Sequence, residues 1–301
     1  MPAEKHQHKT NGEFTKDRKN QSPIDITKDN VVQDKLLKGS SLQIHYKIGD
    51  AQYVKITKTG FLCVCQDNCE SSISASHLKK DADYRLWQFH MHWSDTNDKG
   101  SEHCIDGKHF TGEIHCVFWN KALGNREEAM NHCDGFTVLA IFLDGHEDDN
   151  PALTPIVDSV AKALENEDRK APVLGEFDLN QLLPEKHSYY SYDGSLTTFP
   201  YAECVTWTIL HRHVPIGNSQ LNVLRKIIDH NARNRNRNLV VYPAQSKKQL
   251  HKATNNKVPI YCKTRQCLWR GYYCRTYEQN EKKLVCIKQV MITFNGSELT
   301  Q

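Results

Sequence analysis

The feature that most constrains the fold of this 301-residue chain is a succession of short runs rich in β-branched and aromatic residues. Each run is continuously apolar or alternates between apolar and polar residues, and turn-forming residues separate the runs. This pattern is typical of many short β-strands. The six clearest runs are residues 41–48, 53–65, 84–93, 112–120, 136–145 and 204–216.

Helical spacing is confined to two segments. Residues 219–229 (SQLNVLRKIID) begin with a serine suited to capping a helix and continue with apolar residues at helical spacing, and residues 151–168 form the second segment. The sequence contains no internal repeat of fixed period. We therefore expect one mixed α+β, β-dominated domain with a few helices around a large central sheet.

The charge balance argues against two classes of partner. The chain has 39 basic and 36 acidic residues, a formal charge of +3, so neither nucleic acid nor a membrane surface is expected as its main partner. No apolar run reaches the roughly 18 residues of a transmembrane helix, and the first residues, MPAEKHQHKTNGEFTKD, lack the apolar region of a signal peptide. A cytoplasmic location is expected, with the eleven cysteines as free thiols.

Three segments differ in composition from the rest of the chain. Residues 1–20 are polar and charged, which predicts a loose N-terminal segment, and residues 231–238 (NARNRNRN) predict a solvated loop. Residues 256–301 combine aromatic residues and an excess of Lys and Arg with four cysteines: Cys262, Cys267, Cys274 and Cys286. Three interpretations of this extension are open: a metal- or disulfide-stapled appendage, a basic aromatic patch for a partner, and an unstructured or loosely docked tail. Its last apolar run favours a strand docked on the main sheet.

Two histidines lie within the run YRLWQFHMHW. On a strand, residues two apart point to the same face, with side chains roughly 7 Å apart. His90 and His92 can therefore converge on one metal ion, whereas Phe89 and Met91 point the other way, into a core.

A bare His-x-His pattern also fits two ordinary half-buried histidines, each satisfied by a neighbour. The run GEIHCVFWN supplies a third candidate, His115. Neutral imidazoles bind zinc, copper and iron, but three of them with an open fourth position favour catalytic zinc. The sequence thus predicts a Zn2+ site formed by His90, His92 and His115.

Metal-bound histidines need acceptors for their far N–H groups. Gln88 precedes His90 by two residues and Glu113 precedes His115 by two, so each lies on the face of its histidine. A buried carboxylate requires a partner, which such an N–H would provide for Glu113. A surface-facing glutamate on an edge strand remains the alternative.

Seven segments together carry a family resemblance. They are QSPIDI (21–26), QFHMHW (88–93), GSEH (100–103), GEIHCVFWN (112–120), YDGSLTTFP (192–200), ECVTW (203–207) and YPAQ (242–245). In this order they resemble the α-class carbonic anhydrase family, and its cytosolic-type animal members in particular. The resemblance implies that family's fold, a large and mostly antiparallel twisted sheet, for residues 21–255. The chain departs from the family in a shorter N-terminus without its usual aromatic residues and in the extension 256–301.

The resemblance implies reversible hydration of carbon dioxide to bicarbonate and a proton by zinc-bound hydroxide. It makes the three histidines the zinc ligands, with Gln88 and Glu113 as acceptors for their far nitrogens. Thr197 would accept a hydrogen bond from the hydroxide and pass its own proton to Glu102, while Thr198 would lie at the bicarbonate site. His103 and Tyr192 resemble a supporting hydrogen-bonded pair. The implied apolar pocket for carbon dioxide consists of Val117, Val138, Leu196, Val205 and Trp207.

One implied residue is missing. In the family, a histidine that follows a glycine carries the proton to buffer, and the matching stretch ITKTGFLCV has Phe61 there. Thr59 and Val64 stand at positions that are usually asparagine. Slow proton export and modest turnover are therefore predicted. Substitution of the missing group by His6 or His8 is the alternative.

The cysteines carry two further expectations. The resemblance places polar residues and Tyr201 where extracellular members have a disulfide, so that bond is expected to be absent, and it matches Cys204 to a buried free thiol. Cys63, Cys65 and Cys69 cluster in FLCVCQDNC, where a second metal site is conceivable. Free thiols are favoured because the spacing matches no common zinc pattern.

The sequence leaves three candidate functions to compare: a zinc lyase that hydrates carbon dioxide, a related binding module, and an unrelated zinc hydrolase. A carbonic-anhydrase-like binding module of weak activity would typically lack zinc histidines, and this chain retains all three. An unrelated zinc hydrolase would be expected to carry His-Glu-x-x-His, which the sequence lacks. We therefore predict a monomeric zinc lyase that binds carbon dioxide and bicarbonate and is inhibited by aromatic sulfonamides and anions.

Overall fold

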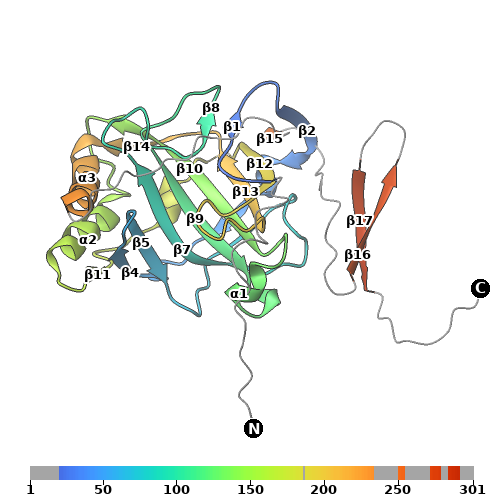
Figure 1. Ribbon diagram of the computed structural model, residues 1–301, viewed down its shortest axis with the longest axis horizontal. Helices are drawn as coiled ribbons and strands as arrows, with labels where there is room; N and C mark the ends of the chain where they lie inside the picture. Colours follow the sequence, from blue (N-terminus) through green and yellow to red (C-terminus); the bar gives the residue numbers. More distant parts are fainter. Residues whose placement is uncertain (1–19, 186, 234–249, 255–271, 279–283, 292–301) are drawn as a thin grey trace, which may run out of the picture.

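The computed structural model describes residues 20–185, 187–233, 250–254, 272–278 and 284–291. Ten strands follow one another across a 13-stranded sheet in the order β11-β4-β5-β7-β9-β10-β13-β12-β15-β2 (Figure 1). Their bounds are β11 (Lys170–Pro172), β4 (Ala51–Ile56), β5 (Phe61–Cys65), β7 (Tyr84–Trp93), β9 (Gly112–Asn120), β10 (Phe136–His146), β13 (Val205–Leu210), β12 (Tyr189–Gly194), β15 (Leu250–Thr254) and β2 (Val31–Lys38).

The remaining described elements are short or lie at the periphery. The strands are β14 (Val214–Gly217), paired with β10, β3 (Gln43–His45) and β6 (Ser72–Ser74), paired with each other, and the parallel pair β1 (Asp25–Ile26) and β8 (Cys104–Ile105). The helices are α1 (Arg126–Ala129), α2 (Thr154–Glu165) and α3 (Asn218–Arg233), with 3-10 turns η2 (Gly39–Ser41), η3 (Lys121–Leu123) and η4 (Leu179–Leu182).

The prediction of a β-dominated fold with a large, mostly antiparallel sheet and few helices is confirmed. The parallel pairs of the main sheet are β10 with β13, β10 with β14, and β15 with β2. Two of the predicted runs each contain two strands. Residues 53–65 divide into β4 and β5 at a turn closed by the Thr57 amide and the Gly60 carbonyl, 2.8 Å apart. Residues 204–216 divide into β13 and β14, which pair in succession along the same edge of β10.

Both predicted helices form, with one correction. α2 lies within the predicted segment and carries a proline in its first turn, where a missing N–H costs nothing. α3 begins at Asn218, so the prediction that Ser219 caps it from outside is wrong. The Ser219 hydroxyl instead bonds the carboxylate of Asp149, which removes it as a cap for the helix amides.

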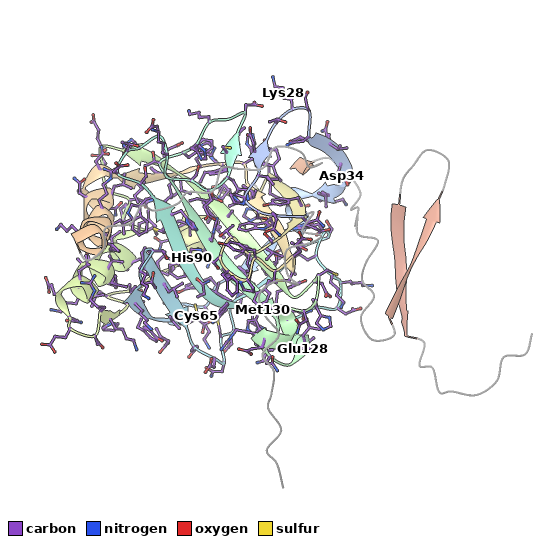
Figure 2. All side chains as sticks on the ribbon, viewed as in Figure 1. Lys28, Asp34, Cys65, His90, Glu128 and Met130 are labelled. Atoms are coloured by element: carbon purple, nitrogen blue, oxygen red, sulfur yellow. The ribbon has the colours of Figure 1, made fainter. Side chains whose placement is uncertain are left out.

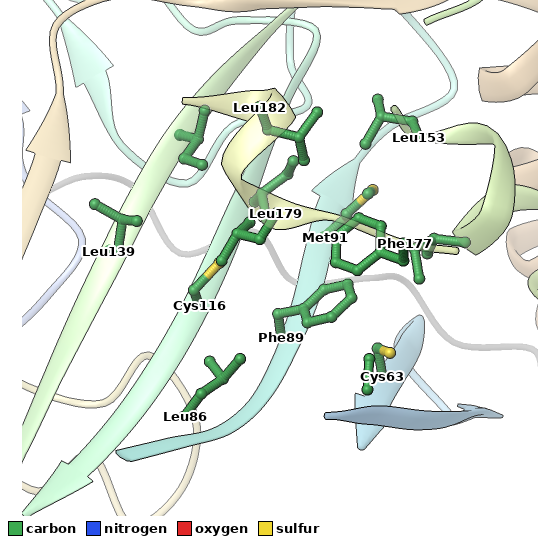
Figure 3. Close-up of a cluster of buried hydrophobic side chains, with 14 of the residues drawn as sticks. Cys63, Leu86, Phe89, Met91, Cys116, Leu139, Leu153, Phe177, Leu179 and Leu182 are labelled. Atoms are coloured by element: carbon green, nitrogen blue, oxygen red, sulfur yellow. The ribbon is translucent and has the colours of Figure 1, made fainter. Parts of the chain in front are cut away.

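The alternating side chains of β7 separate two buried clusters. Phe89 and Met91 enter the cluster beneath α2 and α3, as predicted, and Figure 3 shows them with Phe177 and Leu179. The opposite face of the sheet carries the second cluster. The pairing of β7 with β9 shifts between Leu86 and Gln88, so one extra residue, Trp87, is accommodated there. Trp87 consequently packs against the second cluster.

A buried carboxylate fixes the loop that follows β5. Asp50 Oδ2 accepts hydrogen bonds from Cys69 Sγ at 2.9 Å, the Glu70 amide at 2.9 Å, and the Ser71 amide and hydroxyl, both at 2.7 Å. Burial alone would raise the pKa of Asp50, but the bonds from Cys69 and Ser71 lower it from 3.8 to about 2. The folded state therefore favours the ionised carboxylate.

This lowered pKa predicts an acid-dependent loss of stability. The stabilisation from Asp50 is complete above the unfolded pKa and is lost as the pH falls through about 2. The Asp50→Asn variant is expected to unfold with about 2–3 kcal/mol less free energy at pH 7, and this deficit should shrink between pH 4 and pH 2. Urea unfolding of both proteins at pH 7, 4, 3 and 2 measures it. A deficit that stays constant with pH would contradict the prediction.

The predicted extension 256–301 is described only in β16 (Tyr272–Glu278) and β17 (Leu284–Met291). The two strands pair antiparallel with each other, so the strand expected to dock on the main sheet joins a separate two-stranded sheet instead (Figure 1). Cys262, Cys267, His6, His8, YPAQ and most of NARNRNRN lie outside the described residues. The boundaries 21–255 and 256–301 stay predictions.

The described cysteines include the cluster noted in the sequence. Cys63, Cys65 and Cys69 are buried free thiols, as are Cys116 and Cys204. Within the described parts of the chain, no group of metal-binding side chains contains a cysteine. None of the helices described there has both the length and the apolar character that crossing a bilayer requires.

Candidate active site

Three histidines converge on the face of the sheet opposite to α2 and α3. His90 and His92 come from β7 and His115 from the adjacent β9, where it pairs in register with His90. One nitrogen from each ring lies within 4.8 Å of the other two. The ring centroids are 4.6–5.2 Å apart. Figure 2 places His90 near the middle of the main sheet.

The far nitrogens of two of these rings are held by the residues that the sequence pairs with them. Gln88 Oε1 lies 2.9 Å from His90 Nδ1, and Glu113 Oε1 lies 2.8 Å from His115 Nε2. An acceptor at those atoms fixes the proton there and leaves the lone pair on His90 Nε2 and His115 Nδ1. His90 and His115 thus each present an unprotonated nitrogen to a common point, which His92 Nε2 also faces, 3.1 Å from His115 Nδ1.

Burial keeps two of the imidazoles neutral. It lowers the pKa of His90 well below 6.5, and the neighbouring rings of His92 and His115 add to the effect. Burial and His115 lower the pKa of His92 to about 3. Burial also acts to lower the pKa of His115, but the charge of Glu113 outweighs it and raises the value. Neutral imidazole is the form that binds a metal.

Glu113 is completely buried, and both of its carboxylate oxygens have hydrogen-bond partners. It accepts hydrogen bonds from the amides of Glu102 at 2.9 Å and His103 at 2.8 Å, and it lies 2.7 Å from His103 Nδ1. The other nitrogen of His103 lies 2.7 Å from the Tyr192 hydroxyl, which bonds Ser22 Oγ at 2.7 Å. The alternative of a surface-facing Glu113 is therefore wrong, because β9 is a central strand.

The Glu102 carboxylate lies beside two of the three rings. Its Oε2 lies 3.5 Å from His92 Nε2 and 3.9 Å from His115 Nδ1. That atom is buried and makes no hydrogen bond within the described residues. Burial raises the pKa of Glu102, against the opposing effects of His115 and of a hydrogen bond with Thr197. The structure thus brings Thr197 and Glu102 into the contact that the sequence resemblance implies.

This arrangement fits zinc. Three imidazole nitrogens converge, two of the rings have their far nitrogens fixed, and an unpaired buried carboxylate oxygen lies beside them. His103, Glu113 and His115 also lie close enough to hold a metal, but their mutual hydrogen bonds use those atoms. The three-histidine group is therefore the candidate metal centre.

The residues implied for an apolar pocket lie together in one cluster, which contacts His115 through Trp207. Val117, Val138, Val205 and Trp207 are buried in one cluster, and Leu196 packs against it. The Trp207 ring lies 4.9 Å from that of His115, and its indole N–H bonds the Ser195 carbonyl at 3.1 Å. Thr198 lies exposed in the same loop, where its carbonyl accepts from the Tyr201 amide at 2.7 Å.

Phe61 does not face the histidines. Its ring is buried in the cluster beneath α2 and α3 and stacks on Trp93 at 6.0 Å. β5 pairs with β7 through Cys63 and Phe89 and through Val64 and Gln88, so Val64 shares the face of Gln88. The alternation of β5 places Leu62 on that face as well. The sequence did not point to Leu62, because the face that each residue of β5 occupies depends on the register of its pairing with β7.

An arginine lies over two tryptophan rings at the border of the apolar cluster that contains Val117. The Arg126 guanidinium lies 5.2 Å from the ring of Trp87 and 5.8 Å from that of Trp119. Both tryptophans are partly buried against the cluster that contains Val117. The sequence singled out Trp87 only as an apolar neighbour of the histidines, and Arg126 carried no signal because α1 brings it there from outside any predicted run.

Comparison with known proteins identifies the family. The family model described as eukaryotic-type carbonic anhydrase matches residues 4–253. The chain is 35% identical to Carbonic anhydrase 1 of Mus musculus over 210 aligned residues. The alignment covers 69% of this chain and 78% of that relative. The chain is 34% identical over 209 residues to Carbonic anhydrase 1 of Oryctolagus cuniculus, with 69% and 86% covered.

A match to Carbonic anhydrase 1 of Monodelphis domestica is similar, with 34% identity over 213 residues, 69% of this chain and 78% of the relative. The family model, the relatives and the β-dominated fold agree. The chain therefore belongs to the eukaryotic-type carbonic anhydrase family.

Proposed function

We propose that this chain catalyses the reversible hydration of carbon dioxide to bicarbonate and a proton, with zinc held by His90, His92 and His115. The observation that carries the proposal is the convergence of three ring nitrogens within 4.8 Å beside the unpaired Oε2 of Glu102. Membership of the family supports it. Bound zinc supplies a nucleophile at neutral pH by lowering the pKa of a water molecule to about 7, a value for which this family is the standard example.

Two residues of the chain orient that nucleophile. The Thr197 hydroxyl donates a hydrogen bond to Glu102. The Thr197 oxygen can therefore accept a hydrogen bond from the nucleophile but cannot donate one to it. Thr197 would thereby orient the nucleophile supplied by the metal, with Glu102 holding the Thr197 hydroxyl in place. Gln88 and Glu113 act on the ring orientation of the ligands, and His103 with Tyr192 fixes Glu113 in turn.

The apolar cluster suits carbon dioxide. Val117, Val138 and Trp207 offer a nonpolar molecule a dry surface without hydrogen-bond donors that would hold it in one unreactive orientation. Leu196 and Val205 complete this surface, and Thr198 would contact the bicarbonate product at its exposed side. Aromatic sulfonamides, bound as anions through nitrogen, and small anions are expected inhibitors.

Proton export is expected to limit turnover. The face of β5 next to Gln88 carries Leu62 and Val64, which have no titratable proton, and Phe61 is buried in the other cluster. A general base on this wall would normally accelerate transfer by at least about 100-fold. A small buffer that diffuses into the site must therefore replace it.

Stopped-flow hydration of carbon dioxide by zinc-loaded protein, across a series of imidazole concentrations, tests the function. We expect one zinc per chain and a turnover that rises with imidazole until it saturates. Equal turnover in dilute and concentrated imidazole would refute the proposal that proton export limits turnover. Absence of hydration despite stoichiometric zinc would refute the enzyme and favour a binding module of the same family.

The face assignment of β5 gives a matched pair of variants. Val64→His is expected to raise turnover in dilute buffer by about tenfold or more, because an imidazole there stands beside Gln88 on the face of the histidines. Phe61→His is expected to give no gain and a lower melting temperature, because its side chain is buried against Trp93. Stopped-flow rates and thermal unfolding measure both. A gain confined to Phe61→His would reverse the assignment.

We further propose a monomer located in the cytoplasm. Tyr201 stands where extracellular members have a cysteine, and the cysteines of residues 20–233 are free thiols, which supports this location. Analytical ultracentrifugation and cell fractionation test the two statements.

A further inference from the structure

The cysteine cluster of residues 63–69 has no part in the candidate active site. β5 ends at Cys65, and the turn that follows it ends at Cys69, whose amide bonds the Gln66 carbonyl at 3.1 Å. Cys65 and Cys69 both enter the buried cluster beneath α2 and α3, and their thiols are in hydrogen-bonding contact with each other. Two free thiols thus lie side by side across one turn of the chain.

A carboxylate distinguishes the two thiols. Asp50 Oδ2 accepts a hydrogen bond from Cys69 Sγ at 2.9 Å, and the pKa of Asp50 is about 2, so this carboxylate is ionised at neutral pH. It is positioned to take the Cys69 proton while the sulfur attacks an electrophile, as a general base does for a nucleophile. The hydrogen bond with Cys69 and burial raise the pKa of Cys65, which therefore keeps its proton. Cys69 is thus the candidate nucleophile, and Cys65 is its neighbour in the thiol form.

Access from solvent also separates this pair from the other buried thiols. Cys65 is 6% exposed and Cys69 is 5% exposed, whereas Cys63 and Cys116 are both 0% exposed. The tip of the turn, residues 67–68, is exposed. Thiols that oxidise reversibly combine access for a small oxidant with a second thiol close enough to resolve the first product. The pair at the turn meets both conditions.

We propose that Cys65 and Cys69 form a reversible modification site, at which hydrogen peroxide joins them in a disulfide. First, Cys69 Sγ attacks one peroxide oxygen, the O–O bond breaks, and the Cys69 proton passes through Asp50 to the leaving hydroxide. This step gives a sulfenic acid and water. Cys65 Sγ then attacks the Cys69 sulfur, the S–O bond breaks, and hydroxide leaves with the Cys65 proton as a second water. The two thiols lose two electrons, and one peroxide is reduced to two waters. A small dithiol reverses the bond by exchange.

The modification site is separate from the three histidines. β5 pairs with β7 through Cys63 and Phe89, and Cys65 shares the face of Cys63 by the alternation of the strand. Figure 3 shows Cys63 and Phe89 in the cluster on that face, which lies opposite to the histidines. The disulfide therefore leaves the candidate metal centre intact, and the inference does not depend on the proposed function.

Peroxide treatment of the reduced full chain tests the proposal. The reaction is stopped with N-ethylmaleimide, and the products are mapped by mass spectrometry after proteolysis, which distinguishes this bond from any other between cysteines of the chain. We expect a disulfide between Cys65 and Cys69 as the main product, reversed by dithiothreitol. Cys63 and Cys116 should react with N-ethylmaleimide only after the chain is unfolded.

Four variants separate the roles. Cys65→Ser should stop the reaction at a sulfenic acid on Cys69 that dimedone traps, Cys69→Ser should leave Cys65 reduced, and the control Cys116→Ser should form the disulfide unchanged. Asp50→Asn should slow disulfide formation by about tenfold or more, because the base is lost. A reaction that required unfolding would instead be faster in this less stable variant. That outcome, oxidation confined to the exposed Cys133, or absence of the Cys65–Cys69 bond overturns the proposal.

Discussion

Replacement of His92 by alanine is expected to remove stoichiometric zinc and to reduce carbon dioxide hydration by more than the roughly 10–100-fold that loss of an outer hydrogen-bond partner costs. His92 contributes one of the three converging nitrogens, 3.1 Å from His115 Nδ1. Its removal leaves two nitrogen donors, too few for a stable zinc site. Glu113 and its partners keep all their contacts, so the fold should survive.

Zinc content after dialysis and stopped-flow hydration measure this prediction on the same sample. His146→Ala is the matched control, because the side chain of His146 is exposed and lies outside the group of three. The control should retain one zinc per chain and unaltered turnover. A His92→Ala protein with full zinc and undiminished activity would show that the metal is held elsewhere.

The second large effect is expected for stability. Glu113→Ala should lower the free energy of unfolding by about 3–5 kcal/mol, as the removal of one partner from a buried charged network does. The substitution leaves two backbone amides and the N–H groups of His103 and His115 without their acceptor. Both His103 and His115 are buried, so their donors have no access to water in exchange.

Urea unfolding at pH 7 in the presence of a chelator measures this loss separately from any effect of zinc. Glu128→Ala serves as the control, because Glu128 pairs with His132 on the surface, and its loss should cost below about 1 kcal/mol. Equal unfolding midpoints for Glu113→Ala and the unmodified chain would mean that water replaces the carboxylate.

The strand pattern of the sequence was sufficient to place His90 and His92 on one face, whereas His115 joins them through the pairing of β9 with β7. A two-residue period fixes the face of a side chain within one strand, which explains the agreement for His90, Gln88 and Phe89. It fails where a strand contains an extra residue, as at Trp87, because the period restarts there. It also gives no face for Phe61, the first residue of β5, without the pairing to β7.

Other features depend on contacts between distant segments. The hydroxyl of Ser219 is taken by Asp149, 70 residues earlier in the chain, so its local suitability as a helix cap does not decide its role. The unpaired oxygen of Glu102 and the contact of Cys69 with Asp50 arise from tertiary packing alone. No period or motif within one segment encodes them.

The contact between Ser22 and the loop at Ser195 has a consequence for biosynthesis. The Ser22 amide bonds Ser195 Oγ at 2.9 Å across 173 residues of sequence, and Ser22 Oγ accepts from the Ser195 amide at 3.0 Å. At about 5–20 residues per second, a ribosome needs about 9–35 s to synthesise the chain between them. The loop that carries Thr197 is thus tied to the beginning of the chain only late in translation. Until then, the nascent chain exposes an incomplete sheet, and it depends on the cell to keep that sheet from aggregating.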